Sequence, residues 1–111
     1  MNNKYYLYIL NLEDKKFYIG VTTKLSDRLD QHNNGYGSKW TKLYKPISVL
    51  QTKDLGYLNY HEASLYENHV TYLYIKKYGT SRVRGGSFCA VKPSPRSVAI
   101  DLSKFRKLFD K

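Results

Sequence analysis

The chain has 111 residues, 41% of them hydrophobic, so it is long enough for one domain with a modest core and too apolar to be disordered. Its net charge of +10 favours a polyphosphate partner such as a nucleic acid, although a basic solvated surface gives the same balance. A single cysteine excludes an intramolecular disulfide and a cysteine-based zinc site, and the lack of a long apolar run or signal peptide predicts an intracellular, soluble protein with no membrane partner.

The first predicted elements are two strands over residues 5–10 and 16–21, joined by a polar turn. The first strand carries Tyr8, and the second ends in Tyr18-Ile19-Gly20. Tyrosine is common in strands because its ring fills a core, so both tyrosines fit a packing role as well as an active site.

A helix is predicted within residues 22–35, with a threonine or serine cap at its start and Asn34-Gly35 at its end. Its leucines share one stripe with Arg28 and His32, which carries both side chains towards the hairpin. An arginine in that place needs a partner, and either a phosphate or a carboxylate suits it. His32 also fits a simple hydrogen bond at the helix terminus.

Residues 35–41 are predicted to form a loop anchored by Trp40, followed by a third strand over residues 47–52. A long helix is predicted over residues 59–77. Glu67 lies at the edge of the buried stripe of this helix, where its carboxylate could hold Mg²⁺ or pair with a basic side chain.

Residues 91–111 are predicted to be a basic C-terminal extension, with a short helix over 99–109, packed on the domain of residues 1–90. Between residues 68 and 100 there are six basic residues and no acidic one, which favours contacts with phosphates. The candidate nucleic-acid contacts are Lys39, Trp40, Lys76, Lys77, Arg82 and Arg84.

The ordered set of motifs resembles the GIY-YIG nuclease family over about residues 5–88. Tyr6-Leu7-Tyr8 matches the first triplet of the family, with Tyr6 in place of glycine, and Tyr18-Ile19-Gly20 matches the second. Further along the chain, the family's polar residues are matched in order by Arg28, His32 and Glu67. Residues 78–88 are similar to a run found in small stand-alone members.

The resemblance implies an α+β fold with a small antiparallel three-stranded sheet flanked by helices. It implies a metal-dependent endonuclease that hydrolyses DNA phosphodiester bonds, with a place in DNA repair or recombination. Tyr18 would orient or deprotonate the attacking water beside Tyr8, and Arg28 would hold the scissile phosphate. His32 would contact phosphate or relay protons, and Glu67 would bind one Mg²⁺ or Mn²⁺.

Two alternatives stay open from the sequence: a nucleic-acid-binding module without turnover, and a nuclease directed at RNA. The combination of Glu67 with the tyrosines and Arg28 favours the enzyme, because a binding module needs no carboxylate facing phosphate. A monomer fits the sequence, as does a partner subunit that supplies specificity.

Overall fold

The computed structural model describes residues 2–85, so the expected C-terminal extension and its helix over residues 99–109 lie outside the described residues. The elements follow in the order β1 (Asn3–Leu12), a 3₁₀ turn (Glu13–Lys15), β2 (Lys16–Thr22), α1 (Leu25–Asn33), α2 (Lys39–Leu43), β3 (Pro46–Leu58), α3 (Tyr60–Tyr78) and β4 (Val83–Gly85).

The strands form one mixed sheet in the order β3-β1-β2-β4. β1 pairs antiparallel with both β2 and β3, whereas β4 pairs parallel with β2. The α+β class is confirmed, but the expectation of a purely antiparallel, three-stranded sheet was wrong. β4 has only three residues, too few to show a strand pattern, and α3 returns the chain so that β4 runs in the direction of β2.

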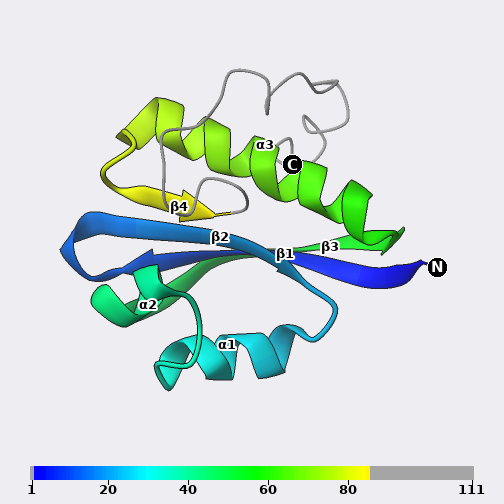
Figure 1. Ribbon diagram of the computed structural model, residues 1–111, viewed down its shortest axis with the longest axis horizontal. Coiled ribbons are helices and arrows are strands. Elements are labelled where there is room, and N and C mark those ends of the chain that lie inside the picture. The colour runs from blue at the N-terminus through cyan, green and yellow to red at the C-terminus, as the bar shows by residue number, and fades with distance from the viewer. Residues whose placement is uncertain (1, 86–111) are drawn as a thin grey trace.

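The helices cover the two faces of the sheet, with α3 on one side and α1 and α2 on the other (Figure 1). Because side chains alternate along a strand, β1 contributes to both faces. Leu7 and Ile9 pack in a core with Val70 of α3. Tyr8 and Tyr18 pack in a second core, which includes leucines of α1 and aromatic residues of α2 and its cap.

The observed ends of α1 and α3 agree only in part with the helix ends predicted from the sequence. The expected threonine or serine cap of α1 was wrong, because Lys24 takes the N-cap position without a side-chain hydrogen bond. Asn34 ends α1 as expected and is followed by Gly35 at φ 79°. α3 begins after Asn59, whose side chain forms a reciprocal capping box with Glu62.

Two elements differ in extent from the sequence prediction. α2 occupies part of the expected loop, capped by the Ser38 hydroxyl, which accepts from Thr41 N–H at 3.2 Å. β3 extends over 13 residues instead of the expected 47–52, with register shifts against β1 that interrupt its alternation. None of the helices within residues 2–85 has the length and apolar character needed to cross a membrane.

Candidate active site

Tyr8 lies at the centre of the site, on the face of the sheet covered by α1 and α2. Across the hairpin it is paired with Gly20, and its side chain is only 1% exposed. A Cβ on Gly20 would lie 2.3 Å from the Tyr8 hydroxyl oxygen, so the phenol rests on bare backbone that only glycine provides. The Tyr8 hydroxyl and His32 Nε2 form a hydrogen bond of 2.9 Å.

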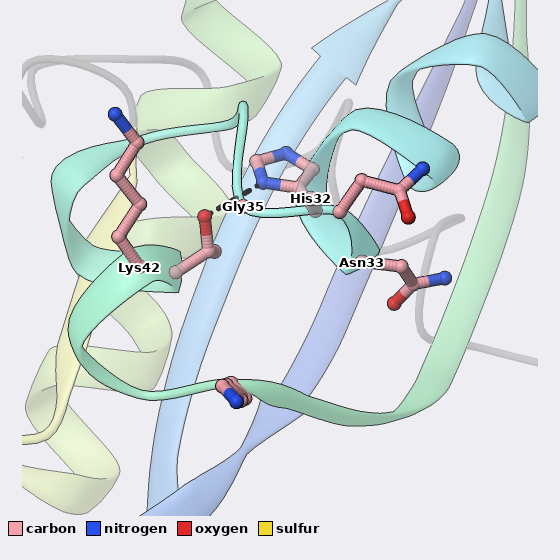
Figure 2. Close-up of a pocket in the computed structure, with 7 residues that line it drawn as sticks. His32, Asn33, Gly35 and Lys42 are labelled. Carbon is pink, nitrogen blue, oxygen red and sulfur yellow. Dashed lines mark hydrogen bonds between the residues drawn. The ribbon is translucent and has the colours of Figure 1, made fainter.

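His32 is placed in the last turn of α1 and is also 1% exposed. Its second ring nitrogen, Nδ1, is 2.9 Å from the Thr41 hydroxyl of α2. A Cβ on Gly37 would lie 2.1 Å from Nδ1, so the chain between the two helices closes tightly over the ring. His32, Thr41 and Lys42 line a cavity of about 270 Å³, and Figure 2 shows the His32 ring and the Lys42 side chain beside it.

The environment of His32 keeps its imidazole neutral. Burial, and secondly the positive charge of Arg28, lower the pKa of His32 to about 4. At neutral pH the ring therefore carries one proton, and its two nitrogens act as one donor and one acceptor.

The buried His32 should make the protein less stable in acid. The unfolded chain binds a proton at His32 near pH 6.5, whereas the folded chain does so only near pH 4, so the free energy of unfolding should decrease as pH falls between these values. The full effect is about 3 kcal/mol, at 1.36 kcal/mol per pKa unit. Urea denaturation at pH 7 and pH 4.5 measures it. His32→Gln should show a flatter pH dependence, and an unchanged dependence in that variant would contradict the assignment to His32.

Arg28 lies one helical turn before His32 and is half-buried. Its guanidinium lies close enough to the phenols of Tyr8 and Tyr18 for them to act on its pKa, and it donates a 2.8 Å hydrogen bond to Gln31 Oε1. Burial disfavours the charge, but the two phenols outweigh burial and the pKa of Arg28 is raised. The pKa of Tyr8 is also raised, by burial first and by Tyr18 second, so Tyr8 stays protonated at neutral pH.

Tyr18 shares the face of Tyr8 but is paired with Leu10, so the two tyrosines are diagonal neighbours rather than opposite partners. Its ring centroid lies 6.3 Å from that of Tyr8 and 5.0 Å from that of His32. On its other side Tyr18 is paired with Arg84 of β4 in the parallel ladder. Tyr18 is 7% exposed, compared with 1% for Tyr8, which makes it the more accessible phenol.

Glu67 reaches the site from α3, the helix on the opposite face of the sheet. Its Oε2 accepts a 2.7 Å hydrogen bond from the backbone N–H of Val21, the residue after Gly20. The carboxylate is close enough to raise the pKa of Tyr8, although less than burial and Tyr18 do. The Glu67 carboxylate therefore lies at the end of β2, within electrostatic reach of Tyr8.

At this site Glu67 offers one carboxylate that could bind a hard divalent ion. Within residues 2–85 there is no cluster of three or more histidine, cysteine or acidic side chains. An ion held here would rely on the Glu67 carboxylate, water and substrate oxygens. Mg²⁺ accepts such a set, since it keeps several waters and is often bound by one or two carboxylates together with substrate phosphate.

The expected nucleic-acid contacts gather at the hairpin end of the sheet, where α2, β4 and the C-terminal end of α3 lie around the β1–β2 turn (Figure 1). Arg84 lies 4.4 Å from the ring centroid of Trp40, and Lys16 Nζ lies 5.8 Å from the same ring. Arg82 donates from Nε to the Lys15 carbonyl oxygen at 2.7 Å. The two arginines thus brace β4 against its neighbours as well as adding positive charge.

Three of the remaining contacts are exposed cations, and one is an anchor. Trp40 is half-buried and donates from Nε1 to the Phe17 carbonyl oxygen at 3.0 Å, which ties α2 to β2. Lys39 of α2 and Lys76 and Lys77 in the last turn of α3 are exposed.

Sequence reasoning missed several residues that shape this site. Lys16 adds positive charge at the hairpin end of the sheet, because the hairpin places it next to Trp40. The only sequence feature that could have indicated this role is its position as a basic residue at the start of an aromatic strand. Thr41 and Gly37 surround His32 from a segment expected to be a loop. The spacing of residues in the sequence cannot predict the contacts of Thr41 and Gly37 with His32, because α1 and α2 come together only in the folded chain.

Comparison with known proteins identifies one matching family model and several similar proteins. A family model described as the GIY-YIG catalytic domain matches residues 4–82. The chain is similar to the UPF0213 protein YsiG of Lactococcus lactis subsp. lactis, with 44% identity over 57 residues, which is 51% of this chain and 55% of the relative. It is also similar to a UPF0213 protein of Streptococcus pneumoniae, with 36% identity over 63 residues, which is 57% of this chain and 62% of the relative.

A UPF0213 protein of Streptococcus pyogenes is 47% identical over 47 residues, which is 42% of this chain and 51% of the relative. The chain therefore spans between 51% and 62% of the length of these three relatives. No solved structure matches the chain.

Proposed function

Because the chain belongs to the GIY-YIG family, we propose that it is a metal-dependent endonuclease that hydrolyses phosphodiester bonds in DNA. Membership of the family implies a nuclease-type function. The choice of DNA as substrate rests on the basic end of the sheet, and the metal dependence rests on Glu67. The activity, substrate and partners of the whole protein are part of this proposal.

One observation carries the proposal: Arg28 lies close enough to the phenols of Tyr8 and Tyr18 for them to raise its pKa, near the end of the strand where Val21 N–H donates to Glu67. A half-buried arginine whose neighbours include the uncharged phenols of Tyr8 and Tyr18 is suited to receive an anion. A purely structural arginine is more often neutralised by an acidic side chain.

Arg28 would bind a non-bridging oxygen of the scissile phosphate and stabilise the negative charge that develops there. Its planar guanidinium offers five N–H donors in a fixed arrangement, so it can contact the tyrosine hydroxyls and a phosphate together. The half-burial of Arg28 reduces screening by water, which strengthens this interaction.

Tyr18 would orient the attacking water through its hydroxyl, because it is the more accessible of the two phenols. Tyr8 is buried and protonated, which suits a fixed hydrogen-bonding role between His32 and Arg28. His32 is neutral and lies 2.9 Å from the Tyr8 hydroxyl, so it would orient that hydroxyl through a hydrogen bond, whereas its low pKa makes it a weak base for net proton transfer.

Glu67 would hold the divalent ion, Mg²⁺ or Mn²⁺, on the carboxylate that the Val21 N–H orients. When bound, such an ion polarises the phosphate as a Lewis acid and stabilises the leaving oxygen. The positive charge at the hairpin end would contact phosphates further along the duplex without reading base sequence.

A substrate panel tests the proposed function. Equal amounts of plasmid, single-stranded DNA, branched DNA and RNA are incubated with the protein in Mg²⁺ or Mn²⁺, and binding is measured in parallel. Cleavage of one or more DNA substrates is the expected result. Binding to DNA without cleavage of any substrate would favour a binding module, and cleavage confined to RNA would favour the RNA-directed alternative. Either outcome would refute the proposal.

Tyr18→Phe should lower turnover by about 100-fold, the lower end of the range for loss of a group that handles the attacking nucleophile. The ring that packs near Tyr8 and His32 is kept, so the melting temperature should change little. Tyr57→Phe is the matched control, since it removes one hydroxyl from a side chain that is 71% exposed on β3. A stable Tyr18→Phe protein with wild-type turnover would show that the hydroxyl is not used.

A further inference from the structure

Thr41 is connected to the proposed site although it belongs to α2 and has no place in the family-like motifs. Its side chain is 1% exposed, and its hydroxyl lies 2.9 Å from His32 Nδ1. His32 Nε2 in turn lies 2.9 Å from the Tyr8 hydroxyl. A buried line of hydrogen bonds therefore runs from α2 through α1 to the central strand.

The donors along this line can be assigned from its α2 end. Thr41 donates its hydroxyl proton to the Ser38 carbonyl oxygen, at 3.1 Å, because a carbonyl can only accept. The Thr41 oxygen is then left to accept from His32, which requires the proton of the ring to be on Nδ1. A neutral imidazole has one N–H, so Nε2 must be the acceptor, and Tyr8 must donate to it.

The charge of Arg28 agrees with this assignment. Arg28 lies close enough to Tyr8 to act on the pKa of its hydroxyl, and a guanidinium can only donate. With its proton directed towards His32, the Tyr8 oxygen presents its lone pairs to this positive charge.

We propose that Thr41 is a positioning residue that fixes His32 in the Nδ1–H tautomer and so orients the Tyr8 hydroxyl for Arg28. Thr41 would act through His32, because its buried hydroxyl lies against that ring. Its role in turnover rests on the proposed function, because Arg28 matters to catalysis only if it binds the phosphate. Its effect on the tautomer of His32 does not depend on any activity.

Long-range proton–nitrogen NMR correlation of ¹⁵N-histidine-labelled protein tests the tautomer directly, with His32→Gln used to assign the His32 signals. The wild-type spectrum should show a protonated Nδ1 and an unprotonated Nε2. Thr41→Val keeps the shape of the side chain but removes the acceptor, so the proton should move to Nε2. A wild-type Nε2–H tautomer, or a Thr41→Val spectrum identical to that of the wild type, would overturn the proposal.

Two variants separate positioning from simple packing. Thr41→Ser restores the hydroxyl and should restore the wild-type tautomer. Ser38→Ala removes the hydroxyl that caps α2 and lies 3.3 Å from the Thr41 hydroxyl, but it keeps the backbone carbonyl to which Thr41 donates, so its tautomer should also be that of the wild type. If Ser38→Ala changed the tautomer as much as Thr41→Val does, the Ser38 hydroxyl or general loosening of α2 would replace the proposed role.

Turnover supplies the second measurement. Thr41→Val should lower kcat by about 10–100-fold with little change in KM, the range seen when an outer partner that orients a ligand is lost. Thr41→Ser should recover most of the loss. Equal kcat in wild type and Thr41→Val would refute the catalytic consequence. A wild-type protein that cuts no substrate would refute the proposed function, while the NMR result would still decide the role of Thr41.

Discussion

Glu67→Gln should abolish DNA cleavage while leaving the fold intact. Glutamine can still accept the hydrogen bond from Val21 N–H through its amide oxygen, so the change removes charge and little else. Alanine is a poorer choice, because it would leave that partly buried N–H without its acceptor at a cost of about 1–3 kcal/mol. Loss of several kcal/mol of metal-ion stabilisation corresponds to a fall in rate of about 10³-fold or more.

Glu62→Gln provides the matched control for Glu67→Gln. It makes the same change of charge on the same helix, and glutamine also serves at this position of a capping box. Cleavage rates and DNA affinities of both variants are measured against the wild type. DNA affinity of Glu67→Gln should be equal or higher, since a negative charge near phosphate is removed. Wild-type cleavage by Glu67→Gln would contradict the metal assignment.

Arg28→Ala should lower kcat by about 10²–10³-fold, the typical effect of removing one preorganised group that stabilises developing charge. Arg28→Lys should recover only part of the rate, because lysine keeps the charge but cannot contact both phenols and a phosphate with a planar fork. Lys24→Ala removes one positive charge from the exposed N-cap of α1 and serves as the control for general attraction to DNA. Equal losses in Lys24→Ala and Arg28→Ala would refute a specific role.

Arg28→Ala has a second consequence that does not require catalysis. The charge of Arg28 is the second cause of the low pKa of His32, after burial. Its removal should therefore raise the pKa of His32 but leave it below the ordinary value, which NMR titration of His32 can measure. An unchanged pKa would mean that the two side chains are not close neighbours in solution.

The parts of this site that could be predicted from the sequence are those determined by local spacing. Alternation along β1 separates Tyr8 from Leu7, and the helical stripe of α1 carries Arg28 and His32 towards the sheet. Both relations depend only on backbone periodicity, so they hold before any tertiary contact is known. The long helix that carries Glu67 was recognisable for the same reason.

The parts that could not be predicted depend on contacts between distant segments. β4 is recognised as a strand only because it pairs with β2. It has three residues, which are too few to show the alternation that predicts a strand. α2 is equally short, and it matters to the site because Thr41 meets His32. The hydrogen bond between Glu67 and Val21 likewise requires α3 to pack over the end of β2, which no local sequence pattern predicts.

In the proposed function, Glu67, Arg28, Tyr18, Tyr8 and His32 form the site of a metal-dependent phosphodiesterase. The most direct measurement is the conversion of supercoiled plasmid to nicked or linear DNA by the wild-type protein with Mg²⁺ or Mn²⁺, repeated with excess EDTA and again after the metal is restored. We expect cleavage with metal, none with EDTA, and recovery on restoration. Equal cleavage in EDTA, or no cleavage with either metal by protein that still binds the plasmid, would contradict the claim.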